Sequence, residues 1–259
     1  LNKFPQALSK CEGLIMKLPN NSYLLNLYGL ILQQSGKVEK SIIYFQKSLS
    51  FQENNYPAMN NMANSYKNLF KFEKAENLYR KIINDEPKYI NALNNYANLK
   101  KELNQFKNAK ELFLKALKIE PNNLNILLNL SSSCQSLGEI SEAKKYALKI
   151  LKINQTHTSA HKILSTLINY SEDSGNLDEM KKLTNNEVFE KFSFTQKAEI
   201  FFALSKAYED KNNYEKSFNF LNKGNSLIEK NYNKTLNNVE KLFDNIIKLF
   251  ETIDIKYPK

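Results

Sequence analysis

The sequence predicts an all-α protein built from stacked pairs of helices, and three observations support this fold class. The 259 residues include only six Gly and six Pro, which argues against a turn-rich β protein and favours long helices. Apolar residues make up 42% of the chain, which is enough to form a core. Small residues recur at a step of 34, in one series at Ala7, Ser41, Ala75, Ala109 and Ala143. A second series with the same step indicates a repeated helical unit and runs through Gly29, Ala63, Ala97, Ser131 and Ser165.

Each predicted unit consists of two helices, and each helix carries an apolar stripe. The unit that begins at Tyr56 shows the helical spacing, with apolar and small residues at Met59, Met62, Ala63, Tyr66, Ala75, Tyr79 and Ile82. The small residues let the two helices approach closely. Pro87 ends the second helix because proline cannot continue the backbone hydrogen-bond ladder. One pair cannot bury its stripes alone, so the units are expected to stack into a solenoid.

This period and these residue types resemble the tetratricopeptide repeat, whose units stack into a right-handed superhelical solenoid. The resemblance implies a regular array over 1–157, made of a half unit at 1–21 and units at 22–55, 56–89, 90–123 and 124–157. Lys100 departs from the family pattern because it stands where an aromatic or apolar residue is expected, and Glu53 replaces the helix-ending proline.

The regular step is lost after residue 157. We expect a degenerate helical unit at 158–197 and a repeat-like unit at 198–231. Residues 232–259 are expected to form a C-terminal amphipathic helix, over 234–253, and a linker stub. That helix would cover the open end of the stack.

Residues 202–225, FALSKAYEDKNNYEKSFNFLNKGN, carry a second resemblance. They are similar to the last repeat of bacterial proteins in which a repeat array precedes a sulfotransferase domain of the protein-tyrosine-sulfotransferase-like type. The matching residues are Phe202, Ala203, Leu204, Lys206, Ala207, Asp210, Tyr214, Phe218, Leu221, Gly224 and Asn225. The resemblance implies that the chain is the N-terminal part of a larger enzyme. This sequence contains no phosphosulfate-binding loop, so we expect no catalytic residues and no cofactor in it.

The first helix of each unit carries a row of side-chain amides. Its fifth, ninth and twelfth positions point the same way and would line the concave surface of a stack, with the sixth at its edge. The predicted groove residues are Asn26, Asn60, Asn61, Asn64, Lys67, Asn94, Asn95, Asn98, Lys101, Asn129 and Gln135. An amide offers one acceptor and two donors, which suits an extended peptide or protein segment, and the lysines are suited to a carboxylate. In a second interpretation, the same asparagines brace neighbouring helices.

Other kinds of site are disfavoured by the sequence. The net charge of +10 comes from lysines scattered along every predicted helix, so no specific nucleic-acid partner is expected. No apolar run is long enough for a membrane span. His157 and His161 are four residues apart, but His161 occupies a core position and no third ligand is near, so no metal site is expected.

A structural scaffold is the alternative function. The half unit at 1–21 would expose the apolar residues Leu8, Cys11, Leu14 and Ile15, so a homodimer through end helices is a further expectation. Cys11 and Cys134 both occupy core positions and form no disulfide framework. A reduced, cytoplasmic location fits these two cysteines.

Overall fold

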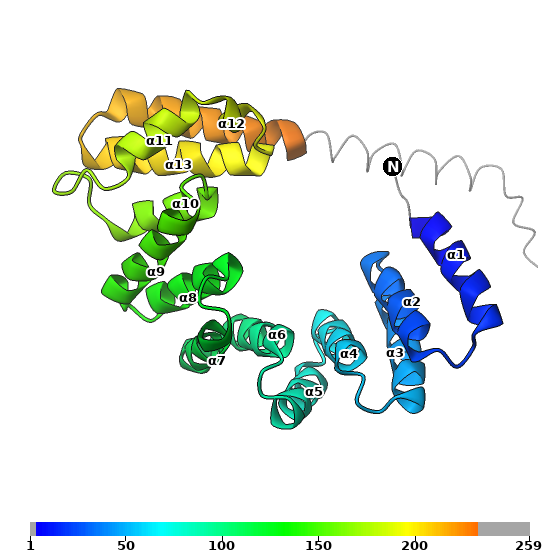
Figure 1. The fold of residues 1–259 in the computed structure, drawn as a ribbon. Helices are drawn as coiled ribbons and strands as arrows, with labels where there is room; N and C mark the ends of the chain where they lie inside the picture. Colours follow the sequence, from blue (N-terminus) through cyan, green and yellow to red (C-terminus); the bar gives the residue numbers. More distant parts are fainter. Residues whose placement is uncertain (1–3, 233–259) are drawn as a thin grey trace, which may run out of the picture. The chain divides into compact units, whose positions relative to one another are not determined.

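The computed structural model describes residues 4–232, and every regular element in that part of the chain is a helix (Figure 1). The first eight helices are α1 (Phe4–Lys17), α2 (Ser22–Gln34), α3 (Val38–Phe51), α4 (Tyr56–Asn68), α5 (Phe72–Asp85), α6 (Ile90–Glu102), α7 (Phe106–Ile119) and α8 (Leu124–Ser136). They are followed by α9 (Ile140–Ile153), α10 (Thr158–Leu167), α11 (Leu177–Thr184), α12 (Glu187–Glu190) and α13 (Phe194–Asp210). Residues 214–232 are also helical. The predicted all-α fold is confirmed.

The turn between the two helices of a unit has a recurrent backbone geometry. A residue with positive φ follows the first helix, at Gly36, Phe70, Asn104, Gly138 and Asn212. The first four of these lie 34 residues apart, so the turn keeps the step of the repeat. Glycine adopts this conformation without steric cost, whereas Phe70, with φ of 58°, is held in a conformation that bulky residues rarely adopt.

Asparagines also begin several of the first helices. The side-chain oxygens of Asn21, Asn55 and Asn123 accept hydrogen bonds from backbone N–H groups in the first turns of α2, α4 and α8. The Asn55 amide also donates to the hydroxyls of Ser22, at 2.7 Å, and Ser48, at 3.2 Å. Part of the asparagine content of the chain therefore serves helix capping and contact between units.

The chain divides after Glu139 into two compact units. In the first unit, α1 to α8 pack in chain order, each against the next, and α2, α4, α6 and α8 also contact one another in succession (Figure 1). These four helices form one layer, which carries the predicted groove residues. The small residues lie in the core as predicted, since Ala63 and Ala97 are fully buried. At Gly29, an added Cβ would lie only 2.6 Å from the ring of Phe45.

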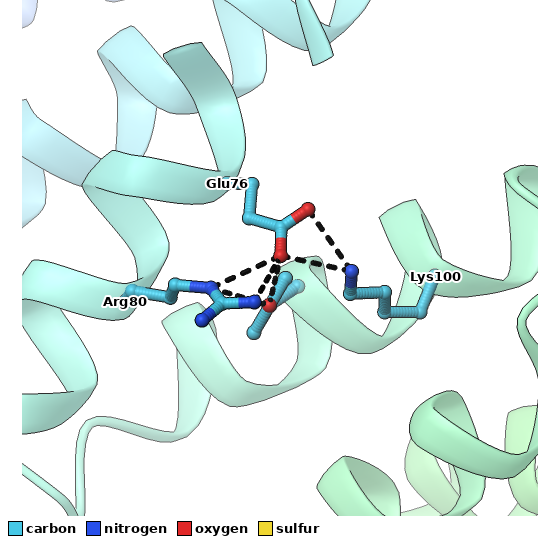
Figure 2. A network of polar contacts seen from close by, with 4 residues as sticks. Glu76, Arg80 and Lys100 are labelled. Carbon is cyan, nitrogen blue, oxygen red and sulfur yellow. Dashed lines mark hydrogen bonds and ion pairs between the residues drawn. The ribbon is translucent and has the colours of Figure 1, made fainter. Parts of the chain in front are cut away.

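Lys100 is buried in the first unit, and its ammonium group is held by a carboxylate of the preceding repeat. Its Nζ lies 2.9 Å from both carboxylate oxygens of Glu76 (Figure 2). The same carboxylate accepts hydrogen bonds from Arg80 and from the hydroxyl of Tyr96. Burial alone would raise the pKa of Glu76, but these hydrogen bonds outweigh burial and lower the pKa to about 2. A charged residue is accommodated at this apolar position because its partner is built into the neighbouring unit.

The second unit contains α9 to α13 and the helix at 214–232. Helix α10 packs against α9 and α13, and it is shorter than the equivalent helices of the regular repeats. A turn and two short helices, α11 and α12, separate it from α13. These elements occupy the region where the sequence predicts a degenerate unit.

A buried chain of hydrogen bonds fixes the turn after α10. His161 donates from Nε2 to the carbonyl of Gln155 at 2.8 Å, and its Nδ1 accepts from the Asn176 amide at 2.5 Å. The hydroxyl of Tyr170 donates to the Asn176 side-chain oxygen at 2.6 Å. All three of His161, Asn176 and Tyr170 are buried. Each partner has a fixed polarity, so this arrangement requires a neutral imidazole.

Several remaining expectations can be compared with the described residues. The predicted helix at 234–253 and the stub that follows lie outside them. Cys11 and Cys134 are buried, as expected for core positions. Within residues 4–232, no helix is long and apolar enough to cross a membrane, and no group of three or more His, Cys, Asp or Glu side chains is placed to hold a metal.

Candidate peptide-binding face

All eleven predicted groove residues lie on the helix layer of the first unit. Helix α2 carries Asn26, α4 carries Asn60, Asn61, Asn64 and Lys67, α6 carries Asn94, Asn95, Asn98 and Lys101, and α8 carries Asn129 and Gln135. Asn60 is buried, and the other ten are partly buried. The sequence therefore identified residues that the fold brings to neighbouring helices.

Two pairs of these asparagines form an amide ladder between successive repeats. The Asn61 amide donates to the side-chain oxygen of Asn26 at 3.0 Å. One repeat further on, the Asn95 amide donates to the side-chain oxygen of Asn60, also at 3.0 Å. Each rung joins the sixth position of one helix to the fifth position of the preceding one. These four asparagines have the bracing role that the sequence left open.

The second repeat, residues 56–89, also pairs its other two inner polar groups. The hydroxyl of Tyr79 donates to the Asn64 side-chain oxygen at 2.6 Å. Lys67 forms an ion pair with Glu102 on α6, with 2.7 Å between Nζ and Oε1. Sequence reasoning missed both partners, because Tyr79 was assigned to the core and Glu102 to a solvated face.

The third repeat, residues 90–123, leaves the equivalent groups without such partners. The side-chain oxygen of Asn94 is inaccessible to solvent and accepts no hydrogen bond in the described part of the chain. Asn98 makes no side-chain hydrogen bond with any described residue. Lys101 has no carboxylate partner among the described residues and makes only two long contacts, 3.5 Å to Asn129 and 3.4 Å to Ser132. We call Asn94, Asn98 and Lys101 the third-repeat triad.

The sequence explains why the triad is unpaired. Phe113 stands 34 residues after Tyr79 and has no hydroxyl to offer Asn98. Ser136 stands 34 residues after Glu102 and has no carboxylate to offer Lys101. Asn129 could have formed the third rung with Asn94, but its side-chain oxygen faces the ammonium of Lys101 instead. A comparison of the repeats position by position would have found this difference before the structure.

The electrostatics of the triad favour a negatively charged ligand group. Lys101 is half-buried, and burial lowers its pKa because the charged ammonium loses solvent. A carboxylate beside it would replace the lost solvation. The unpaired Asn94 oxygen needs a donor, since a buried acceptor without one costs about 1–3 kcal/mol. A ligand that offers both an N–H group and a carboxylate would satisfy both.

Family models described as tetratricopeptide repeat match residues 101–167, residues 58–84, and both 22–55 and 198–231. Together, the matched segments span more than half of the 259 residues. The chain belongs to the tetratricopeptide repeat family. No curated protein matches this tetratricopeptide repeat protein.

Solved structures show the same fold at low sequence identity. A tetratricopeptide repeat protein from Parabacteroides merdae is 19% identical over 86% of each chain, with a TM-score of 0.60. The pilF protein of Pseudomonas aeruginosa is 17% identical, over 77% of this chain and 88% of its own, with a TM-score of 0.62. YrrB is 20% identical, over 71% of this chain and 91% of its own, with a TM-score of 0.54. At these identities the likeness supports the fold alone.

Proposed function

We propose that the inner helix layer of the first unit binds an extended, acidic segment of a partner protein, centred on the third-repeat triad. The observation that carries this proposal is the contrast between two adjacent repeats. In the second repeat, Asn60, Asn64 and Lys67 are paired within the protein, whereas Asn94, Asn98 and Lys101 hold the same positions one repeat later and are not. Natural proteins rarely leave such groups without partners unless another molecule supplies them.

The ligand chemistry follows from the three groups. The Asn94 oxygen would accept a backbone N–H, and the Asn98 amide would pair with the next N–H or C=O of the segment. Lys101 would bind an Asp or Glu side chain or a terminal carboxylate. YrrB, one of the structures with this fold, is a TPR protein with an unusual peptide-binding site, which is compatible with a peptide ligand here.

The experiment uses matched positions in the two repeats. A peptide would first be selected from a random phage-displayed library against the full chain, and its affinity measured by fluorescence anisotropy. We expect Asn98→Ala and Lys101→Met to weaken binding at least tenfold with little change in melting temperature. Asn64→Ala and Lys67→Met are the controls, and we expect them to keep the affinity, with Asn64→Ala lowering the melting temperature. Equal losses of affinity at both sets of positions would contradict a site centred on the triad.

We also propose that the parent protein is a sulfotransferase-like enzyme of the bacterial cytoplasm, to which these repeats present a partner. The support is the sequence resemblance of residues 202–225. The test is whether the complete gene product binds a phosphosulfate donor nucleotide, which the present chain should not bind. A complete gene product that does not retain the donor would contradict this part of the proposal.

The scaffold alternative has a specific observation in its favour. At the first end of the stack, Met16 is 84% exposed, and Leu14 and Leu18 are about half exposed. A second copy could cover these side chains. Light scattering on the wild type and on Leu14→Glu would test this, since a dimer through α1 should dissociate in the variant.

A further inference from the structure

The helix at 214–232 packs against α13 through one stripe of its surface. Asn213 caps its first turn by accepting a hydrogen bond from the Lys216 backbone N–H at 3.1 Å. The ring of Phe220 stacks on Tyr208 with centroids 5.6 Å apart. The hydroxyl oxygens of Ser217 and Ser205 are 3.2 Å apart. The backbone at Gly224 lies so close to a ring of α13 that an added Cβ would be 2.6 Å from it.

A second stripe runs beside the first and is open to solvent. It consists of Tyr214, Phe218, Leu221, Asn225, Ile228 and Tyr232, which we call the outer stripe. Its apolar members are exposed by 65%, 63%, 39%, 40% and 61% of their surface in that order, and Asn225 is also exposed. Nothing in the described part of the chain covers these side chains. Large apolar side chains left in water at this density mark an interaction surface.

We propose that the outer stripe is a two-fold interface through which two copies of this chain pair. The members are spaced alternately by four and three residues, which is the seam of a coiled coil. Lys216, Lys223 and Lys230 recur every seven residues on the opposite side of the helix, so the seam itself is free of cations. The inference is independent of peptide binding, and it gives the scaffold alternative a defined surface in the second unit.

Asn225 indicates that the partner is a second copy and not an apolar cap. It stands in the middle of the outer stripe, between Leu221 and Ile228. Under an apolar helix its amide would be buried without a partner, at a cost of about 1–3 kcal/mol. Across a two-fold axis, the Asn225 side chains of the two copies would face each other, and each amide could donate to the other. A single asparagine in such a seam fixes register and oligomeric state in the same way.

The area of the outer stripe is sufficient for a specific dimer. An aromatic side chain buries about 150–250 Å² when it is fully covered. Because Tyr214, Phe218 and Tyr232 are each exposed by more than half, covering the stripe would bury about 500 Å² per copy, or about 1,000 Å² for two. That total meets the lower limit of about 1,000 Å² for a specific interface.

The sequence beyond the described residues keeps the same phase. At multiples of seven residues from Phe218 and Leu221 it places β-branched residues in one series and leucines in the other, namely Val239, Ile246 and Ile253, and Leu242 and Leu249. This assignment of β-branched and leucine residues to the two seam positions favours two-stranded pairing. The pattern therefore supports a partner that is identical to the chain itself.

The test uses cysteine substitutions in the full chain. Both native cysteines are buried, so Asn225→Cys adds one accessible thiol at the expected two-fold axis. Lys223→Cys is the matched control, two residues away on the other side of the helix. Under mild oxidation, we expect Asn225→Cys to form a disulfide-linked dimer and Lys223→Cys to stay monomeric. Light scattering should give twice the chain mass for the wild type and the monomer mass for Phe218→Glu with Ile228→Glu.

Two results would overturn the proposal. One is a monomeric wild type in which the two cysteine variants cross-link equally slowly. The other is a monomer in which the thiol introduced by Asn225→Cys resists alkylation, because the stripe would then be covered by residues of the same chain. Unchanged circular dichroism of the glutamate variant shows that loss of the dimer is not loss of the fold. Persistence of the dimer in that variant and its loss in Leu14→Glu would place self-association at α1 instead.

Discussion

His161 and Asn176 are joined by a hydrogen bond of 2.5 Å in the interior of the second unit, and the ring nitrogen is the acceptor. Its other nitrogen donates to the Gln155 carbonyl, and Asn176 is oriented by the hydroxyl of Tyr170. The ring therefore has no place for a second proton. Burial also lowers the pKa of His161, because the charged imidazolium would lose its solvent.

This arrangement predicts that acid destabilises the second unit. The folded pKa lies below the unfolded value of 6.5, so the stabilisation is complete above pH 6.5 and is lost as the pH falls below it. The loss approaches about 1.4 kcal/mol per pH unit for this one group. Calorimetry between pH 7.5 and pH 5 would measure it, with His161→Gln as the comparison. If the variant lost stability as steeply as the wild type, another group would be responsible.

Closing the third-repeat triad should stabilise the protein and abolish ligand binding. Phe113→Tyr would supply the hydroxyl that Tyr79 supplies to Asn64 one repeat earlier, with a gain of about 0.5–1.5 kcal/mol. Asn98 would then be unavailable to a peptide. Chemical denaturation and peptide titration of the same sample would measure both effects. Tyr79→Phe is the reverse change, and we expect it to destabilise by a similar amount without loss of affinity.

The turn at Phe70 offers a stabilising substitution. Phe70 has φ of 58° and is 80% exposed, and the equivalent residues of the first and fourth repeats are Gly36 and Gly138. Phe70→Gly should remove backbone strain and stabilise by about 0.5–1 kcal/mol, net of the greater freedom of glycine in the unfolded chain. Thermal denaturation would show the change. Phe70→Ala is the control, since it removes the ring and keeps the strain, and an equal gain there would exclude the backbone as the cause.

The pair of Lys100 and Glu76 predicts a large asymmetry between single and double variants. Glu76→Leu would leave the buried ammonium of Lys100 unpaired and should destabilise by about 3–5 kcal/mol. The double variant with Lys100→Leu should recover much of that loss, because two apolar residues leave no buried charge. Urea denaturation of the wild type, the single variants and the double variant would measure the coupling. Additive effects would mean that the ion pair does not determine stability here.

The carboxylate of Glu76 should also hold its contribution to low pH. Its folded pKa of about 2 lies below the value of 4.5 for a free Glu, so its stabilising effect is present above pH 4.5 and is lost as the pH falls towards 2. The Glu76→Leu variant should therefore lose less stability than the wild type between pH 5 and pH 2. Parallel curves for the two proteins would contradict this assignment.

The sequence predicted the fold well because the repeat constrains it many times over. Ala63, Ala97 and Ser131 share one environment, so a single physical requirement is written in the chain at each step. The same periodicity placed all eleven candidate groove residues on one helix layer. Its power came from what the repeats share.

The sequence reasoning did not predict which of those residues are free. Asn64 and Asn98 are identical in type and position, and their difference depends on a hydroxyl that is present in Tyr79 and missing in Phe113. Both aromatic residues satisfy the same apolar requirement, so the periodic pattern does not distinguish them. Lys100 posed the opposite difficulty, because it breaks the pattern but is accommodated by Glu76 in the neighbouring repeat.

The amide ladder extends from α2 to α6 and does not continue to α8. Along the first three full repeats, neighbouring helices are cross-linked by polar contacts as well as by packing, whereas α8 is held to α6 without that rung. Amide hydrogen exchange should therefore be faster at this joint than at the earlier ones. A peptide seated on the triad would restore the missing link, so occupancy of the site and stiffening of the stack would be the same event.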